Sequence, residues 1–252
     1  MIYRKFQDVQ LSGLGLGMMR LPVQNGDDST VDEAAAAEMI DYAYQNGINY
    51  FDTAWGYHSG NSELVAGKYL SRYPRESYCL ASKFPGYDLS NMDKVEEIFE
   101  RQLEKCQTPY FDFYLFHNVY EGNIDAYLNP EYGILEYLLK QKENGRIRHL
   151  GFSAHGSAEV IQRFLDTNGQ YMEFCQLQIN YMDWHFQKAQ EKAAILQKAG
   201  IPIWVMEPLR GGKLAKASGD LAAAMQSMRP KETVPGWAFR FLQSIPGDCA
   251  VQ

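Results

Sequence analysis

Short apolar runs alternate with helical patterns along almost the whole chain, and this alternation constrains the fold more than any other feature of the sequence. Seven runs have the composition of buried strands, at residues 14–18, 48–52, 78–83, 111–116, 147–153, 174–179 and 202–206. Helical patterns lie between or after them, at about residues 32–45, 62–70, 93–106, 134–144, 158–166, 187–199 and 235–243. Strands that alternate with helices pair in parallel, because each helix returns the chain to the same end of the sheet.

Several helix ends carry capping signals. Thr30 opens a capping box, in which its hydroxyl is expected to accept the amide hydrogen three residues on. Ser90 and Asp93 are expected to cap the helix that ends near residue 106. The pair Asn46-Gly47 supplies the left-handed conformation that ends the first helix.

The first glycine-rich segment and the chain length decide between two parallel α/β architectures. A doubly wound sheet requires the pattern G-x-G-x-x-G between a strand and a helix. Residues 13–17 read G-x-G-x-G instead, and no helix is expected before about residue 32. With 252 residues, the chain has the size of one (β/α)8 barrel. We therefore expect an α/β fold, a (β/α)8 TIM barrel formed by a single domain over residues 1–252. It is C-terminally shortened, because its eighth strand only begins at residues 249–252.

Composition excludes two classes of protein. Lys and Arg total 24 against 31 Asp and Glu, so the net charge is −7, and no basic stripe interrupts the mixture. A protein that binds nucleic acid through its phosphates needs such a stripe. No apolar run approaches the roughly 20 residues that span a bilayer, and the first residues lack the apolar centre of a secretory signal. We expect a cytoplasmic protein with neither nucleic-acid nor membrane partners.

Ionisable and amide side chains stand at the ends of consecutive expected strands. They are Asp52, Lys83, His117, Ser153, Gln176, Gln178 and Glu207, with His155 just beyond the fifth strand and Tyr57 in the loop after Asp52. The carboxyl ends of barrel strands converge on one site. Because ionised groups are costly to remove from water, their repeated placement at strand ends predicts an active site there.

Several motifs carry a resemblance to a known family. They are FDTAWGY at residues 51–57, NSE at 61–63, ASK at 81–83, YLFH at 114–117, GFS at 151–153, Gln176, and EPLRGG at 207–212. In this order they resemble the aldo-keto reductases, most closely the bacterial type that can continue into a C-terminal iron–sulfur module, which is missing here. The resemblance implies an NADPH-dependent carbonyl reductase, with NADH as a possible cofactor and a small carbonyl compound as substrate.

Four residues have the chemistry that carbonyl reduction requires. Hydride transfer to a carbonyl builds negative charge on its oxygen, so an acid must lie within hydrogen-bonding distance. Tyr57 is the expected proton donor, although an unperturbed tyrosine has a pKa of about 10. Lys83 is expected to lower that pKa, while Asp52 pairs with Lys83 and limits the cost of burying its charge. His117 is expected to orient the substrate oxygen.

The resemblance also implies residues around the cofactor and the substrate. Residues expected at the cofactor are Gly17, Met18, Ser153, Gln176, Met206, Glu207, Pro208, Leu209, Arg210, Gly211 and Gly212. Among them, Ser153 and Gln176 would bond the carboxamide, and Leu209 to Gly212 would hold the pyrophosphate with charge from Arg210. Relatives often have asparagine after that serine, where this chain has Ala154. The expected substrate pocket consists of Trp55, Phe84, Tyr120 and His155, the first three as an aromatic wall, and no metal ligands are expected.

The chain departs from the family at its end. Relatives continue into a complete eighth strand and a segment that binds the adenosine 2′-phosphate, whereas this sequence stops at Gln252. An open barrel exposes two strand edges, and such edges favour pairing with another chain. Self-association through these edges is therefore one expectation.

Two other functions stay open at the level of the sequence. One is a regulatory or inactive barrel that binds a nicotinamide cofactor with little turnover, because the C-terminal cofactor segment is absent. The other is a metal-dependent hydrolase with Asp52, His117 and His155 as ligands. This second alternative lacks an HxH pair on the first strand, and Lys83 would add a competing cation.

Overall fold

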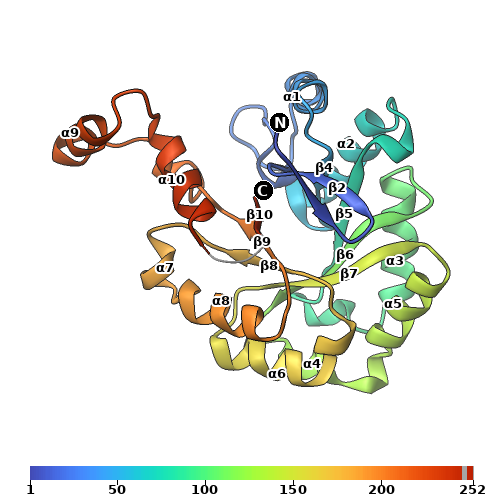
Figure 1. Ribbon diagram of the computed structural model, residues 1–252. Coiled ribbons are helices and arrows are strands. Elements are labelled where there is room, and N and C mark those ends of the chain that lie inside the picture. Colours follow the sequence, from blue (N-terminus) through green and yellow to red (C-terminus); the bar gives the residue numbers. More distant parts are fainter. Residues whose placement is uncertain (246–248, 252) are drawn as a thin grey trace.

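A computed structural model describes residues 1–245 and 249–251 and shows one curled, parallel sheet surrounded by helices (Figure 1). Its strands run in the order β10-β9-β8-β7-β6-β5-β4-β3, and every neighbouring pair is parallel. The strands are β3 (Leu16–Gly17), β4 (Tyr50–Asp52), β5 (Cys79–Phe84), β6 (Phe111–Val119), β7 (Ile147–Ala154), β8 (Cys175–Gln178), β9 (Ile203–Met206) and β10 (Cys249–Val251). Within the described residues no ladder joins β10 to β3, so the sheet keeps two edges.

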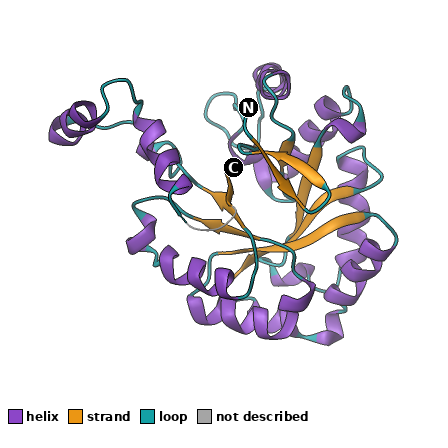
Figure 2. Ribbon diagram, viewed as in Figure 1, coloured by secondary structure: helices purple, strands orange, loops and turns teal. Residues whose placement is uncertain are grey.

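The helices cover the outer face of this sheet (Figure 2). They are α1 (Glu33–Gln45), α2 (Asn61–Leu70), α3 (Val95–Lys105), α4 (Ile124–Leu128), α5 (Ile134–Glu143), α6 (Ala158–Asn168), α7 (Asp183–Phe186), α8 (Ala189–Lys198), α9 (Gly219–Met228) and α10 (Val234–Gln243). Helix α9 stands away from the body and buries none of its residues. In the part of the chain that the structure describes, no helix combines the length and apolar character needed to cross a membrane.

The core lies between the sheet and its helices, as the alternation predicts. Large aromatic side chains such as Phe51, Phe111 and Phe164 are fully buried there. The parallel strand order, the surrounding helices and the family likeness reported below confirm the expected barrel architecture. The beginning of an eighth strand, expected over residues 249–252, is present over Cys249–Val251 as β10 beside β9, and Gln252 lies outside the described residues.

An antiparallel hairpin that the sequence did not predict closes one end of the barrel. It consists of β1 (Tyr3–Phe6) and β2 (Val9–Ser12), paired in antiparallel register. The ring of Phe6 enters the barrel and contacts the rings of Phe113, Phe174 and Trp204 at centroid distances of 4.8–6.4 Å. The hairpin lies at the amino ends of the strands, which leaves the opposite, carboxyl ends open for a site.

The caps expected at two helices, Thr30 at α1 and Ser90 with Asp93 at α3, are wrong. Asp32, not Thr30, caps α1, because its carboxylate accepts the amide hydrogen of Ala35. The hydroxyl of Thr30 instead bonds backbone carbonyls of the preceding loop. Ser90 bonds Asp88 in that loop, and α3 begins after Lys94 without a side-chain cap. The left-handed Gly47 after α1 is confirmed, with φ of +88°.

Candidate active site

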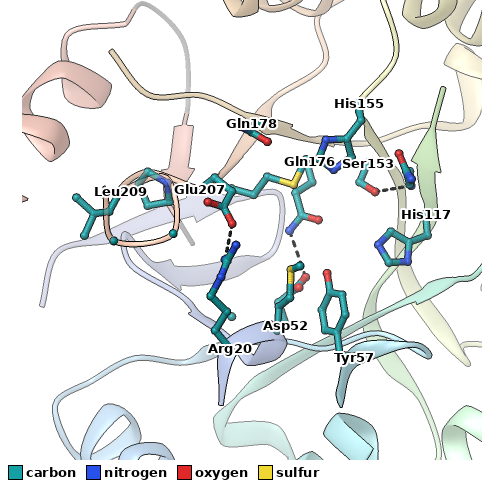
Figure 3. A pocket seen from close by; sticks show the side chains of 17 residues that line it. Arg20, Asp52, Tyr57, His117, Ser153, His155, Gln176, Gln178, Glu207 and Leu209 are labelled. Carbon is teal, nitrogen blue, oxygen red and sulfur yellow. Dashed lines mark hydrogen bonds and ion pairs between the residues drawn. The ribbon is translucent and has the colours of Figure 1, made fainter. Parts of the chain in front are cut away.

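A cleft of about 680 Å³ opens at the carboxyl ends of the strands (Figure 3). Its lining comes from the segments that follow nearly every strand, as expected for a parallel barrel. The lining residues are Gly17, Met19, Arg20, Asp52, Tyr57, His117, Asn118, Ser153, His155, Gln176, Gln178, Met206, Glu207, Pro208, Leu209, Gly211 and Gly212. Most of the side chains expected from strand ends are therefore brought together in one place.

Three of the four expected catalytic side chains meet at the base of this cleft. The ammonium group of Lys83 is fully buried and lies 2.5 Å from Oδ1 of Asp52. The same nitrogen donates to the carbonyl oxygen of Thr53 at 2.9 Å and to the hydroxyl oxygen of Tyr57 at 3.3 Å. The amide of Gln176 donates to the second oxygen of Asp52 at 3.3 Å. The lysine thus links the carboxylate to the phenol and lies beneath both.

The electrostatics of this group differ from the expectation in one respect. Burial raises the pKa of Tyr57 above its ordinary value, and the nearby Lys83 opposes this rise without cancelling it. Lys83 thus lowers the pKa of Tyr57, as expected, but desolvation of the phenol has the larger effect and leaves the pKa above its ordinary value. The pKa of Lys83 is raised: burial opposes its charge, but Asp52 and Tyr57 together outweigh burial. At neutral pH the site holds a protonated phenol beside an ammonium cation.

His117 faces Tyr57 across the cleft. The two rings are 5.8 Å apart between centroids and nearly perpendicular, and the ring of Tyr87 contacts His117 from another side at 5.1 Å. Burial, together with Lys83 and His155, holds the pKa of His117 well below its usual value, so the ring is neutral at pH 7. Within the described residues, its buried Nδ1 has no hydrogen-bond partner. Because a buried unpaired N–H is rarer than a buried unpaired acceptor, we assign the proton to Nε2.

The residues expected at the cofactor divide into two groups. Gly17, Ser153, Gln176, Met206, Glu207, Pro208, Leu209, Gly211 and Gly212 line the cleft. Met18 and Arg210 do not line it. Met18 is fully buried in the core, and its neighbour Met19 faces the cleft instead. Arg210 turns towards α7, where its guanidinium lies 3.4 Å from Asp183 and over the ring of Phe186.

Arg20 lies at the rim of the cleft where a cation was expected from Arg210. Its guanidinium pairs with the carboxylate of Glu207, which links the segment after β3 to the segment after β9. Glu207 adopts a left-handed backbone conformation with φ of +58°, which few residues other than glycine tolerate. No strand-end rule identifies Arg20, because it lies three residues beyond the short strand β3.

Of the four residues expected at the substrate pocket, one lies in the cleft lining. His155 lines the cleft. Phe84 is fully buried in the core, Trp55 packs beneath the ammonium group of Lys105, and Tyr120 lies outside the lining. The expected aromatic wall is therefore not part of the cleft in the described structure. Asn118 and Gln178 provide polar lining in addition to His155. Gln178 was expected at the site because it stands at a strand end, whereas Asn118 was not among the expected site residues.

A second buried polar cluster supports the strand that carries Lys83. Glu63 is fully buried, and its carboxylate accepts hydrogen bonds from Ser82 and Gln102, each at 2.7 Å. Its other oxygen pairs with the ammonium group of Lys105 at 2.7 Å. Gln102 also donates to the backbone carbonyl of Lys83 at 3.0 Å. Helices α2 and α3 are thereby attached to β5 directly behind the site.

Comparison with known proteins identifies the family. Residues 13–244 match the model of the aldo/keto reductase family. The chain belongs to this family. The match begins directly after β2 and ends directly after α10, so it includes every strand from β3 to β9. Among the described residues, no group of three or more His, Cys, Asp or Glu side chains is arranged to hold a metal ion.

Several proteins and structures are similar to this chain. It is 28% identical over 227 residues to an Escherichia coli (strain K12) protein named NADH-specific methylglyoxal reductase, covering 82% of this chain and 66% of that protein. It is 28% identical over 214 residues to the probable aldo-keto reductase 1 of Glycine max, covering 82% and 58%. The chain thus spans less than two thirds of both relatives.

Solved structures show the same fold. A Bacillus halodurans aldo-keto reductase in its holo form has a TM-score of 0.77 at 24% identity, covering 100% of this chain and 86% of that one. A Klebsiella pneumoniae aldo-keto reductase, solved in complex with NADPH, has a TM-score of 0.76 at 20% identity, covering 100% and 84%.

Proposed function

We propose that this chain is an oxidoreductase that uses a nicotinamide cofactor to reduce an aldehyde or ketone to an alcohol. We take NADPH as the expected cofactor and NADH as the alternative. One observation carries the proposal: the buried ammonium group of Lys83 contacts both the carboxylate of Asp52 and the hydroxyl of Tyr57 at the base of a cleft. A buried charge is costly unless it is paired, so a lysine held at a phenol there favours a chemical role.

The four side chains divide the work of proton transfer. Tyr57 is protonated at neutral pH and donates its proton to the substrate oxygen as negative charge develops there. Lys83 stabilises the phenolate that remains, because its ammonium group already lies 3.3 Å from that oxygen. Asp52 holds the lysine in place. The Nε2–H of neutral His117 donates a hydrogen bond that orients the carbonyl. The cofactor, when bound, supplies the hydride.

The cleft has the donors and the space that a nicotinamide cofactor requires. The hydroxyl of Ser153 accepts the amide hydrogen of Asn118 at 2.8 Å, so its own proton remains available for a carboxamide. Gln176 provides an amide on the neighbouring strand. A Cβ atom added at Gly17 would meet nothing within 4 Å, so the wall there is open backbone against which a ring can lie.

The rim of the cleft has features suited to a pyrophosphate. Gly211 and Gly212 both have positive φ, and a chain of such glycines allows phosphates to approach backbone amides closely. The guanidinium of Arg20 lies about 3.5 Å from the position of a Cβ on Gly211. We therefore assign to Arg20 the charge that the motif at residues 207–212 led us to expect from Arg210. The relatives named for NADH and solved with NADPH support a cofactor of this class.

Titration of the 252-residue chain with NADPH and with NADH, followed by tryptophan fluorescence, tests the proposal. We expect saturable binding of at least one cofactor, followed by loss of absorbance at the nicotinamide band when methylglyoxal or another small aldehyde is added. Ser153→Ala should weaken binding about tenfold, the effect of one lost hydrogen bond. Ser227→Ala, on the exposed helix α9, is the matched control and should change nothing.

Two outcomes would contradict the proposal. Failure to bind either cofactor would show that the cleft is not a cofactor site. Tight binding without turnover of any aldehyde or ketone would support the alternative of a regulatory barrel. Equal binding of NADPH and NADH would leave the reductase standing and would remove the expected preference for NADPH.

A further inference from the structure

The backbone carbonyl of Lys83 lies near the end of β5, beyond the part of that strand that pairs with β4. The ladder between the two strands ends at the pair Asp52 and Ala81. The amide of Thr53 then donates to the carbonyl oxygen of Ala81 at 2.9 Å. Carbonyl groups two residues apart along a strand point to the same side, so the carbonyl of Lys83 faces the side that β4 has already left. A buried carbonyl in this position needs a donor from another element.

The side-chain amide of Gln102 is that donor. Gln102 lies on α3 and is fully buried, and its Nε2 donates to the carbonyl oxygen of Lys83 at 3.0 Å. The same nitrogen faces Oε1 of Glu63 at 2.7 Å and Oγ of Ser82 at 2.9 Å. The other end of the amide, Oε1, accepts from the hydroxyl of Tyr114 at 2.5 Å. Because acceptors surround one end and a donor meets the other, the amide has a single orientation, with its nitrogen towards Lys83.

Gln102 thereby contacts both strands that carry catalytic side chains from this side of the barrel. Ser82 and Lys83 belong to β5, and Tyr114 lies opposite Ser82 on β6, three residues before His117. The amide thus connects the ends of two neighbouring strands to one helix, and it does so directly behind the active site.

The contact between Lys83 and Tyr57 is the one most sensitive to a movement of β5. The ammonium group lies 2.5 Å from Asp52 and 2.9 Å from the carbonyl oxygen of Thr53, but 3.3 Å from the hydroxyl oxygen of Tyr57. Bonds between N–H groups and oxygen normally span about 2.7–3.2 Å. A displacement of the strand end by a few tenths of an ångström is therefore enough to break the contact with Tyr57, while the shorter bonds to Asp52 and Thr53 remain.

We propose that Gln102 is a positioning residue of the active site. Its amide holds the end of β5 so that the ammonium group of Lys83 stays within hydrogen-bonding distance of the hydroxyl of Tyr57. Gln102 itself lies outside the cleft lining, so it acts on the reaction through Lys83. The inference rests on the proposed reductase function, in which Lys83 stabilises the phenolate of Tyr57.

The variants Gln102→Met and Tyr114→Phe remove opposite ends of this arrangement. Methionine is also unbranched and fills a similar space, but it has no amide to donate to Lys83. Phenylalanine removes the hydroxyl that donates to Oε1 and leaves the bond from Nε2 to Lys83, so Tyr114→Phe is the matched control for a lost buried hydrogen bond. Both variants should unfold at a lower urea concentration than wild type. Only Gln102→Met should lower kcat for a small aldehyde, by about tenfold, with an unchanged dissociation constant for NADPH.

A spectroscopic signal from Tyr57 makes the test independent of turnover. In protein labelled with carbon-13 at Cζ of tyrosine, the nuclear magnetic resonance signal of Tyr57 is the one that Tyr57→Phe removes. We expect this signal to shift in Gln102→Met and to keep its wild-type position in Tyr114→Phe. If Gln102→Met does not fold, Gln102→Asn takes its place, because asparagine retains an amide in the cluster but ends one carbon short of Lys83.

The outcomes separate this inference from the proposed function. A Tyr57 signal that does not move, or an equal fall of kcat in both variants, would overturn the inference and leave the reductase function intact. A shifted signal in the Gln102 variant, together with no reduction of any aldehyde by wild type, would overturn the reductase function and leave the positioning of Lys83 by Gln102 standing.

Discussion

Replacing Lys83 by Met is expected to separate the contribution of this lysine to folding from its contribution to catalysis. The substitution keeps most of the apolar volume and removes the ammonium group. Asp52, only 3% exposed, then loses its contact at 2.5 Å and keeps the weaker bond from Gln176 at 3.3 Å. Removing one partner of a buried ion pair costs about 3–5 kcal/mol. For a chain of this size, the midpoint of thermal unfolding should fall by roughly 6–20 °C.

The double variant Lys83→Met with Asp52→Asn shows whether this reasoning is right. Asparagine removes the unpaired charge, so we expect the double variant to regain at least half of the lost unfolding free energy. It should regain no turnover, because the ammonium group beside Tyr57 is still missing. The assays are urea unfolding and cofactor oxidation with a small aldehyde. A double variant that is no more stable than Lys83→Met, or one that recovers turnover, would refute this account.

The loss of unfolding free energy caused by Lys83→Met should also depend on pH in a defined direction. Burial raises the pKa of Asp52 even with Lys83 present, and loss of the cation removes the main opposing effect. A carboxyl group whose pKa is higher in the folded state than in the unfolded state stabilises the fold at pH values below its unfolded pKa of about 4. Its contribution to the unfolding free energy is lost as the pH rises. The stability difference between wild type and variant should therefore be larger at pH 7 than at pH 4.5. An equal difference at both pH values would show that the carboxylate is not the source.

Three further substitutions test other parts of the structure. Gly151→Ala would place a Cβ 2.5 Å from the ring of Phe174. Urea unfolding should therefore show a free energy of unfolding lower by about 1–3 kcal/mol. An unchanged free energy of unfolding would show that the strands can separate there. Lys105→Met leaves the buried carboxylate of Glu63 without its cation. The midpoint of thermal unfolding should fall, as it does when one partner of a buried ion pair is removed. An unchanged midpoint would mean that the hydrogen bonds from Ser82 and Gln102 are enough to stabilise the carboxylate. The depressed pKa of His117 means that wild type loses stability as the pH falls below about 6.5. The unfolding free energy of His117→Gln should therefore decline less between pH 7 and pH 5, and an equal decline would contradict the assignment.

The strands and the site at their ends could be predicted because both rest on local patterns. Apolar runs ending in Asp52, Lys83 and His117 identify buried strands with chemistry at their carboxyl ends, and the structure brings these three together with Tyr57. The hairpin with Phe6 could not be found in this way. Its strands carry mixed polar residues, and Phe6 is partly buried only because the barrel end provides a place for it.

The missed lining residues have a common cause, namely backbone geometry that departs from a regular strand. Residue 118 was placed beyond a strand expected to end at 116, whereas β6 continues through a bulge to Val119 and Asn118 is part of the cleft lining. Met18 and Met19 lie in a 3-10 helix over Met18–Arg20 that follows the two-residue strand β3, so the strand periodicity expected for residues 14–18 cannot tell which of the two faces the cleft. Arg210 was assigned to the cleft from its motif, but its φ of +49° and the carboxylate of Asp183 direct it elsewhere.

Comparison of wild type with Tyr57→Phe tests the central claim most directly. The substitution removes one oxygen atom, the atom that lies 3.3 Å from the ammonium group of Lys83, and keeps the ring that faces His117. Loss of a proton donor from the transition state typically lowers the rate by about 10²–10⁴-fold. We predict a loss of this size in kcat for a small aldehyde, with an unchanged dissociation constant for the cofactor. Turnover within about threefold of wild type, with the same cofactor affinity, would contradict the role of Tyr57 as the proton donor.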